Sequence, residues 1–382
     1  MMYFDNAATT SPKPLAVRRA VARALAEYTA NPGRSGHEAA QRCALAVYEC
    51  RQKVAGFFGL SREENVIFTP SCTYSVNQVL FGLLHEGDHV VTSPLEHNAV
   101  MRPLHELTRR GVSFDAADFS ADDEDAMLRS MAALITPRTK LIVCMHASNV
   151  FGIRLPIERV AQLCGERGLL LAVDAAQSAG VFPIDMERMG IHYLCVAAHK
   201  GLYAPMGCGL LLINGPLPAP LLFGGTGTQS ISPEQPEDPP ERLESGTLNV
   251  PAILGISAGL GFVRTRGADN ILRHEISLMQ RLYDGLAETR GIQLYTGRPE
   301  REGYAPVLSF NVQGMPAEEA GERLGRAGFA LRAGLHCAPA AHRHIGTLEQ
   351  GTVRASVSVF TARDEIDKLV LAVRELAKSH AG

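Results

Sequence analysis

Two stretches of the chain decide its fold: Leu169–Gln177, LLLAVDAAQ, and Tyr193–Lys200, YLCVAAHK. Each is a short apolar run that leads into a charged residue, Asp174 in the first stretch and Lys200 in the second. Strands of a parallel sheet that is covered on both faces are continuously apolar, and ligands of such sheets bind beyond the carboxyl ends of the strands. The pair therefore predicts two strands that present an acid and a lysine at the ligand-binding edge of one sheet.

Further short apolar runs flank this pair, and helical patterns separate them. The helical patterns are clearest over 75–84 and 156–167. Such alternation predicts an α/β domain built on a mostly parallel sheet. The expected strands are Val66–Thr69, His89–Thr92, Lys140–Met145, Leu169–Asp174, Tyr193–Ala197 and Gly209–Ile213.

The composition changes near residue 230. Residues 230–240, SISPEQPEDPP, are acidic and rich in proline, which predicts an exposed loop. The chain that follows is expected to be largely helical over 250–289 and then to form a smaller α+β unit. Its expected elements are strand 306–312, helix 317–327, strand 353–360 and a last helix with Thr361 as its N-cap.

These patterns predict two domains. We expect a large α/β domain over residues 15–257 and a small α+β domain made of residues 1–14 and 258–382. The length of 382 residues is sufficient for both to bury a core without disulfide bonds.

Composition excludes several classes of protein. The chain is 46% hydrophobic, and 37 basic against 40 acidic residues give a net charge of −3, so no basic surface for a nucleic-acid partner is expected. The eight cysteines lack the density of a disulfide scaffold and the paired spacing of a zinc site. His342 and His344 flank an arginine, which predicts a solvated loop and no metal site.

The N-terminal sequence MMYFDN lacks the cations of a signal peptide. No apolar run approaches the ~20 residues of a membrane helix. We therefore expect a cytoplasmic protein with no membrane partner and with reduced thiols.

Asp174 and Lys200 together suit pyridoxal phosphate (PLP). The lysine would form a Schiff base with the aldehyde, and the acid would keep the pyridine nitrogen protonated. Taken singly, a solvent-exposed lysine and a helix-capping aspartate are equally good interpretations, because such residues are common at strand ends. The pairing, with His199 beside the lysine, favours the cofactor.

Two further segments suit the same ligand. Thr69–Thr73, TPSCT, precedes a helical pattern and offers hydroxyl and free backbone N–H groups to a phosphate. His97 follows another strand and suits stacking on a flat ring and proton transfer. The ordinary alternatives are a helix cap for the first segment and a structural histidine for the second.

Eight motifs then add up to a family resemblance. Together they resemble the class V aminotransferase-like, PLP-dependent cysteine desulfurase and selenocysteine lyase family, from residue 3 to about residue 378. The resemblance implies the fold of a PLP-dependent transferase of fold type I, with a large domain on a mostly parallel sheet and a smaller α+β C-terminal domain. The motifs are DNAATT (5–10), EHN (96–98), SNVFG (148–152), VDAAQ (173–177), HKG (199–201), LESGTLN (243–249), RAGLHCA (332–338) and RAS (354–356).

The resemblance implies roles around the cofactor. Lys200 matches the Schiff-base lysine, which also moves the Cα proton, and Asp174 matches the acid on the pyridine nitrogen. The remaining matches hold the ring or the phosphate: His97 stacks on the ring, Gln177 donates to its phenolate oxygen, Thr73 and His199 bind the phosphate, and Thr247 binds it from the other subunit of a homodimer.

Cys72 and Ala197 depart from the family pattern at two positions of the phosphate cup, the group of residues that would bind the phosphate. Many relatives have threonine at the first position and serine or threonine at the second. The resemblance thus implies a cofactor-binding position at Cys72 that lacks its hydroxyl. Each lost hydrogen bond would weaken the phosphate cup by ~1 kcal/mol.

The resemblance also implies a substrate site. Asn149 and Arg354 match the pair that binds the substrate carboxylate, for which an arginine fork is well suited. Cys337 matches the nucleophile, and Arg34 matches a loop at the mouth of the site. The other seven cysteines lie in helical or strand patterns or beside them and are expected to pack in the core.

The implied activity is that of a cysteine desulfurase, which removes sulfur from L-cysteine to give L-alanine and a persulfide on Cys337. Because a thiol is mostly protonated at neutral pH, His336, Arg332 or the substrate is expected to promote the thiolate. The sulfur would pass to an acceptor such as a carrier protein. Three alternatives stay open. The first is a selenocysteine lyase, in which Cys337 is dispensable because selenium leaves more readily. The second is another PLP-dependent C–S lyase, aminotransferase or epimerase, which needs Lys200 and not Cys337, and the third is a non-catalytic sulfur-relay or cofactor-binding scaffold that recruits a partner, against which the full set of catalytic residues argues.

Overall fold

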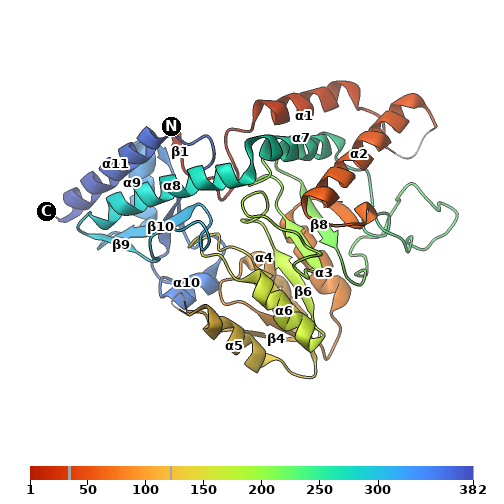
Figure 1. Ribbon diagram of the computed structural model, residues 1–382, viewed down its shortest axis with the longest axis horizontal. Helices are drawn as coiled ribbons and strands as arrows, with labels where there is room; N and C mark the ends of the chain where they lie inside the picture. The colour runs from red at the N-terminus through yellow and green to blue at the C-terminus, as the bar shows by residue number, and fades with distance from the viewer. Residues whose placement is uncertain (33–35, 121–122, 382) are drawn as a thin grey trace.

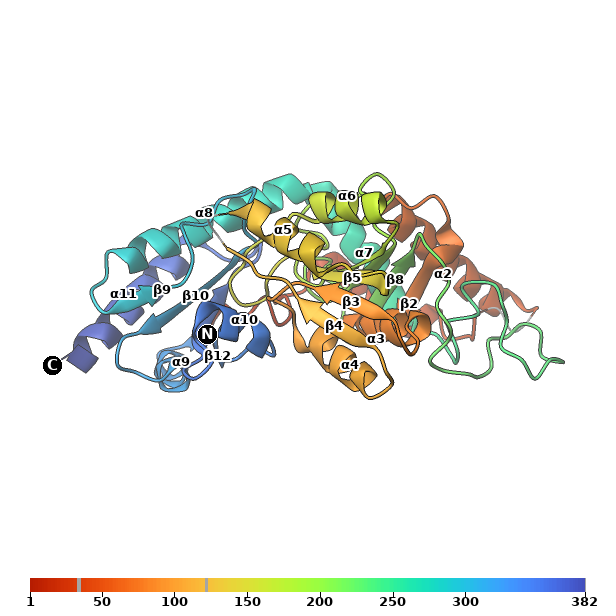
Figure 2. The same cartoon turned by 90° about the horizontal axis from the view of Figure 1, so that it is seen from below.

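The computed structural model describes residues 1–32, 36–120 and 123–381. The larger half of the molecule is built on a sheet of β2 (Val66–Thr69), β3 (His89–Thr92), β4 (Ser113–Ala116), β5 (Thr139–Met145), β6 (Leu170–Asp174), β7 (Tyr193–Val196) and β8 (Gly209–Ile213). The strands lie in the order β2-β8-β7-β6-β5-β3-β4 (Figures 1 and 2).

Most of this sheet is parallel. β7, β6, β5, β3 and β4 run parallel to their neighbours in this series, whereas β8 runs antiparallel to both β7 and β2. The predicted α/β fold is confirmed, and each of the six predicted strands is present to within one residue at either end. The sequence pattern does not reveal β4, because this half-exposed edge strand, SFDA, has no continuous apolar run.

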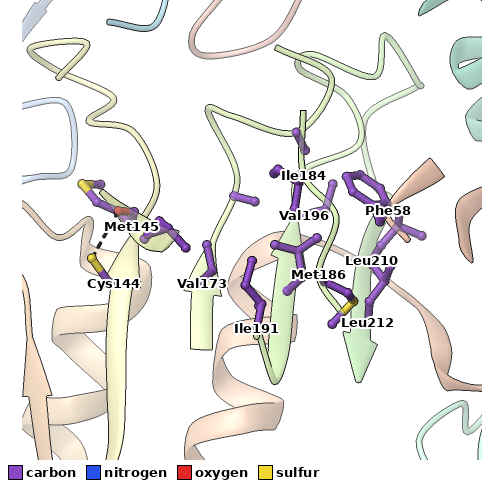
Figure 3. Packing of buried hydrophobic residues seen from close by; sticks show 14 of the residues in the cluster. Phe58, Cys144, Met145, Val173, Ile184, Met186, Ile191, Val196, Leu210 and Leu212 are labelled. Carbon is purple, nitrogen blue, oxygen red and sulfur yellow. Dashed lines mark hydrogen bonds between the residues drawn. The ribbon is translucent and has the colours of Figure 1, made fainter. Parts of the chain in front are cut away.

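Both faces of the sheet are buried, and successive residues of each strand point to opposite faces. In β8, Leu210 and Leu212 lie in the apolar core of one face, and Leu211 and Ile213 lie in that of the other. Figure 3 shows part of the first core, with Phe58 beside Leu210. Burial on both faces explains why the strands have continuous apolar sequences.

The helices of this half are α1 (Leu15–Glu27), α2 (Glu38–Phe57), α3 (Cys72–Leu83), α4 (Asn98–Thr108), α5 (Glu124–Leu134), α6 (Ile157–Arg167) and α7 (Val250–Arg266), with a short 3-10 turn at Glu63–Asn65. Helices α3 and α4 cover one face of the sheet, and α5 and α6 cover the other together with α2 and α7 (Figure 2). Helix α1 packs along α7 (Figure 1). The helices predicted over 75–84 and 156–167 correspond to α3 and α6.

The smaller half contains an antiparallel sheet and its own core. Its strands are β9 (Ile292–Leu294), β10 (Val307–Val312), β12 (Arg332–Gly334) and β13 (Thr352–Ser356), in the order β12-β13-β10-β9. Helices α8 (Ala268–Ala287), α9 (Ala317–Arg326) and α11 (Arg363–Ala381) pack around this core. The start of the chain joins this half, because β1 (Met2–Tyr3) pairs with β11 (Phe329–Ala330). This pairing places the first strand beside the smaller sheet, while α7 continues past residue 257.

Two details of the predicted C-terminal elements are wrong. The strand expected over 353–360 ends at Ser356, and the last helix begins at Arg363. Thr361 does not cap that helix, since its hydroxyl accepts a hydrogen bond from the Ser358 amide at 3.1 Å. Glu365 instead accepts one from the Ala362 amide at 2.8 Å.

Residues 214–249, between β8 and α7, form neither helix nor strand, so the loop predicted over 230–240 is confirmed. Across the described ranges, no helix combines the length and the apolar character that a membrane crossing requires.

Candidate active site

A pocket of about 520 Å³, counting the space open to solvent at its mouth, lies at the carboxyl ends of the parallel strands. This is the edge at which sheets of this kind bind ligands. The pocket gathers residues from five separate segments of the large half. Eight residues predicted from the sequence line it: Cys72, Thr73, His97, Asn149, Asp174, Gln177, His199 and Lys200.

Asp174 is the last residue of β6, and it is buried. Its Oδ1 accepts a hydrogen bond from the Ala176 amide at 2.9 Å. The thiol of Cys72 lies 3.4 Å from the same oxygen. Cys72 therefore contacts the carboxylate instead of facing the phosphate cup, where the loss of a hydroxyl was expected to matter.

Lys200 follows β7, and its side chain lines the pocket. Burial lowers the pKa of its amine, and the nearby Asp174 opposes this shift. The carbonyl oxygen of His199 accepts hydrogen bonds from Thr10 Oγ1 at 3.2 Å and from Lys13 Nζ at 2.5 Å. Burial lowers the pKa of Lys13 to about 8. Residues 10–13 thus fix the backbone that carries Lys200, a role that the sequence signalled only through the motif at 5–10.

His97 is the N-cap of α4, where its Nδ1 accepts a hydrogen bond from the Ala99 amide at 2.9 Å. The neutral ring therefore carries its proton on Nε2. Burial lowers the pKa of His97, and Lys200 lowers it further, while Asp174 acts in the opposite direction. The imidazole is neutral near pH 7.

A cradle for an anion lies at the start of α3. Ser71 is the N-cap and accepts a hydrogen bond from the Tyr74 amide at 3.2 Å. The amides of the first helical residues, including Thr73, have no partner within the helix and so face an incoming anion. His199 Nδ1 lies 3.1 Å from Thr9 Oγ1, which leaves its Nε2 for a ligand.

This set of groups fits PLP. The cradle suits the phosphate, the buried Asp174 suits a protonated pyridine nitrogen, and the amine of Lys200 suits the aldehyde. Gln177, which was expected to donate to the phenolate oxygen of the ring, also has a partner within the protein. Its Nε2 donates a hydrogen bond to the Ala7 carbonyl at 2.9 Å. One amide hydrogen of Gln177 is therefore already used by the protein.

Arg354 lies in β13 of the small half and contacts Asn149, which lines the pocket. Arg354 is 1% exposed. Its Nη2 pairs with Asp5 Oδ1 at 2.6 Å, and its Nη1 donates to the Asn149 carbonyl at 2.8 Å. Its Nε is buried without a hydrogen-bond partner among the described residues. A guanidinium has five N–H groups and these two contacts use two of them, so a buried arginine beside a pocket suits a carboxylate ligand.

Cys337 lies between β12 and α10 (Pro339–Ile345), and α10 lies between the two sheets (Figures 1 and 2). Cys337 is exposed, whereas the seven other cysteines are buried, as predicted. Arg332 Nη2 lies 3.8 Å from its sulfur. The positive charges of Arg332 and Arg354 both lower the pKa of Lys200, although less than its burial does. The segment that carries Cys337 therefore lies on the same side of the pocket as the lysine amine.

His336 and Arg332, the two residues expected to promote the thiolate, differ in charge. Burial lowers the pKa of His336 to about 3, so this ring is neutral and supplies no positive charge. Arg332 remains as the cation beside Cys337. The solvated loop predicted around His342 is wrong, because His342 lies in α10, is fully buried, and is 2.8 Å from Thr347 Oγ1.

Thr247, predicted to bind the phosphate of the partner's site, does not line this pocket. Thr247 is exposed and lines a second cavity of about 690 Å³ together with Tyr74 and Leu222. Arg34 lies outside the described residues.

The chain is similar over its whole length to known proteins. A model of the aminotransferase class-V family matches residues 2–369. A probable cysteine desulfurase of Methanothermobacter thermautotrophicus is 32% identical, with 98% of this chain and 94% of that protein aligned. A probable cysteine desulfurase of Pyrococcus abyssi is also 32% identical, with 99% and 95% aligned.

Solved structures of similar proteins also cover nearly the whole chain. The apo structure of a cysteine desulfurase from Thermococcus onnurineus superimposes with a TM-score of 0.91 at 31% identity, covering 99% of this chain and 95% of that one. The Escherichia coli cysteine desulfurase CsdA, in its S-sulfonic acid form, gives a TM-score of 0.87 at 29% identity, covering 98% and 94%. The similarity therefore includes both halves of the molecule.

Proposed function

The chain belongs to the aminotransferase class-V family, and we propose that it is a cysteine desulfurase that transfers the sulfur of L-cysteine to Cys337. Its fold is that of PLP-dependent transferases of fold type I. The observation that carries the proposal is the pairing of two features: a pocket with Lys200 and Asp174, and a single exposed thiol beside the cation of Arg332.

PLP, when bound, supplies a ring that withdraws electrons from the Cα of an amino acid. Lys200 and Asp174 would hold its aldehyde and its pyridine nitrogen, and the start of α3 would hold its phosphate. His97 would stack on the ring with its Nε2 proton directed away from the Ala99 amide. The thiol of Cys72 would compete with the ring nitrogen for the same oxygen of Asp174.

Arg354 would bind the carboxylate of L-cysteine through its guanidinium, helped by the amide of Asn149. The Asp5 partner holds the guanidinium in place and uses one of its five N–H groups, which leaves further donors for the substrate. This arrangement would fix the Cα–H bond toward Lys200. Lys200 would take the proton from Cα through its neutral amine and would later return it. The lowered pKa of Lys200 increases the fraction of this residue that carries a neutral amine.

Cys337 would attack the sulfur of the substrate as a thiolate. The new bond joins the two sulfur atoms, and the bond between Cβ and sulfur breaks. The electron pair of that bond stays with Cβ, which takes up a proton and becomes the methyl group of L-alanine. The product on the protein is a persulfide, which a second thiol then removes. Arg332 Nη2, 3.8 Å from the sulfur, would hold the reacting sulfur by a charge-assisted contact.

We also propose a homodimer in which Thr247 reaches the phosphate of the partner's site. Thr247 is exposed and does not line the pocket of its own subunit. Large apolar side chains are exposed on the same part of the chain: Met206, Leu222, Phe223 and Ile231. A dimer would cover them. A cytoplasmic location and a protein acceptor for the persulfide complete the proposal, and the eight unpaired thiols fit a reducing compartment.

Product analysis tests the proposed function. The PLP-loaded enzyme is given L-cysteine and a thiol reductant, and sulfide and alanine are measured for the wild type and for Cys337→Ala. Equal amounts of sulfide and alanine from the wild type alone are expected. Pyruvate and ammonia in place of alanine would instead indicate a C–S lyase, and turnover of selenocysteine without turnover of cysteine would indicate a selenocysteine lyase.

A further inference from the structure

The segment that carries Cys337 has an unusual backbone. His336 and Cys337 both have positive φ angles, 52° and 58°, although neither is a glycine. Two successive side-chain-bearing residues in the left-handed region are unfavourable and persist only when their surroundings hold them. The fold therefore has to supply contacts that fix this segment.

Two hydrogen bonds hold the carbonyls of these same residues. Asn149 Nδ2 donates to the His336 carbonyl at 2.8 Å, and the Asn98 amide donates to the Cys337 carbonyl at 2.7 Å. Both donors belong to the large half, whereas the segment belongs to the small half. The position of the thiol thus depends on contacts that cross between the two halves.

Asn149 also belongs to the substrate side of the pocket. Its side chain lines the pocket, and it is buried, with 6% of its surface exposed. Its backbone carbonyl accepts a hydrogen bond from Arg354 Nη1 at 2.8 Å. Its Oδ1 is buried without a hydrogen-bond partner among the described residues, as is Arg354 Nε. One residue thus touches both the guanidinium and the nucleophile segment.

The amide of Asn149 has room for a second acceptor. Its nitrogen carries two hydrogen atoms, and the His336 carbonyl takes one of them. The other hydrogen remains for a carboxylate held by Arg354, whose Nη1 contacts the backbone carbonyl of the same residue. A carboxylate bound there would restrict rotation of the amide and so keep the first hydrogen on the His336 carbonyl.

We propose that Asn149 is a positioning residue that couples occupation of the carboxylate site to the placement of the Cys337 thiol. The substrate's carboxylate orients the amide, and the amide holds the His336 carbonyl and with it the left-handed segment. By reciprocity, a segment held in this way also favours binding of the carboxylate. The identity of the substrate rests on the proposed function, whereas the contact between Asn149 and the segment does not.

Hydrogen exchange of the PLP-loaded enzyme tests this coupling without turnover. The peptide spanning Arg332–His342 is followed with and without L-alanine, which carries the same carboxylate as L-cysteine. In Asn149→Ala we expect its amides to exchange about tenfold faster, the factor that corresponds to one buried hydrogen bond. L-alanine should slow this exchange in the wild type and not in the variant.

Gln78→Ala is the matched control, because Gln78 is a buried amide that donates to the Ala219 carbonyl at 2.6 Å elsewhere in the large half. Its exchange over Arg332–His342 should equal that of the wild type. Asn149→Asp, which keeps the size and loses the donor, guards against a folding defect of the alanine variant. Exchange within twofold of the wild type in both Asn149 variants, or equal protection by L-alanine, would overturn the proposal.

A kinetic comparison provides a second readout. Loss of Asn149 should weaken the binding of both cysteine and selenocysteine, but kcat for cysteine should fall about tenfold further, because only cysteine needs a placed thiol. Equal losses of kcat on the two substrates would assign to Asn149 carboxylate binding alone and would contradict the coupling. Failure of the wild type to desulfurate would count against the proposed function and leave the exchange result intact.

Discussion

The two sides of the site are built differently. The cofactor side, which consists of Asp174, Lys200, His97 and the start of α3, lies at the ends of buried strands and helices of the large half. The nucleophile side, Arg332, Cys337 and Arg354, comes from the small half, and its thiol sits on a short segment with left-handed backbone.

This difference separates two kinds of requirement. A cofactor that stays bound needs a rigid, buried frame, which regular strands supply through packing on both faces of the sheet. A thiol that must receive sulfur and then release it to an acceptor needs exposure, which Cys337 has. Exposure removes packing as a means of positioning, so a few hydrogen bonds between the two halves of the molecule replace it.

The largest expected effect comes from breaking the cofactor side. Lys200→Ala should lose turnover of cysteine and of selenocysteine by at least ~10³-fold, because no other amine replaces it as the proton carrier. The absorbance of the enzyme after addition of PLP and borohydride should show no stable adduct. The control is Lys140→Met, a partly buried lysine at the start of β5, where Nζ contacts the Leu83 carbonyl at 2.6 Å. Loss of activity in the control would undermine the comparison.

Removing the nucleophile should affect one substrate only. We expect Cys337→Ala to lose sulfide formation from cysteine by at least ~10²-fold and to keep selenocysteine turnover to within a few-fold, because selenium leaves without an attacking thiol. Cys164→Ala removes a buried thiol from α6 and should still release sulfide. Parallel loss on both substrates would mean that Cys337 supports the cofactor side and is no separate nucleophile.

The cofactor side of the site can be predicted from the sequence to a large extent. The strands that carry Asp174 and Lys200 were predicted to within one residue, because burial on both faces leaves a continuous apolar pattern. The whole cofactor side could thus be located from local patterns, and the family resemblance added the roles.

The nucleophile side could be located only through the resemblance. Left-handed angles at His336 and Cys337 leave no glycine or asparagine signal, and a three-residue strand such as β12 has no periodicity to detect. The contacts of Asn149 and Lys13 join residues far apart in the chain, and no local pattern encodes them. The neutral state of His336 follows from burial, which the sequence does not show.

Arg332→Gln should have a moderate effect. The guanidinium lies 3.8 Å from the Cys337 sulfur and would stabilise negative charge on this atom as it reacts. We expect iodoacetamide to modify Cys337 about threefold to tenfold more slowly at pH 7 in this variant, and Arg332→Lys to recover part of the rate. His336→Gln is the comparison, since the neutral ring adds no charge. An unchanged rate in Arg332→Gln would contradict the role of this cation.

The smallest expected effect concerns the contribution of Glu96 to the free energy of unfolding. Burial raises the pKa of Glu96 to about 8, while its Oε1 accepts a hydrogen bond from the Met145 amide at 2.7 Å. Because the pKa of Glu96 in the folded protein lies above its ordinary value of 4.5, the folded state holds a proton that the unfolded chain releases. The stabilisation is fully present below the unfolded value and is lost as the pH rises to about 8.

Glu96→Gln should remove this pH dependence. Between pH 5.5 and pH 8 the free energy of unfolding of the wild type should fall relative to the variant by on the order of 1–3 kcal/mol. The shift of the thermal midpoint between the two pH values measures it. Glu275, whose pKa burial also raises to about 8, contributes the same trend to both proteins and cancels in the comparison. Identical shifts in the two proteins would show that Glu96 is ionised in the folded state.

The most direct test of the account joins its two sides in one measurement. The PLP-loaded enzyme is mixed with L-cysteine in the absence of a reductant, and peptides are analysed by mass spectrometry while alanine is quantified. The account predicts one additional sulfur atom on Cys337, none on the seven buried cysteines, and one alanine for each sulfur retained. Alanine without sulfur on Cys337, or sulfur on another cysteine, would contradict it.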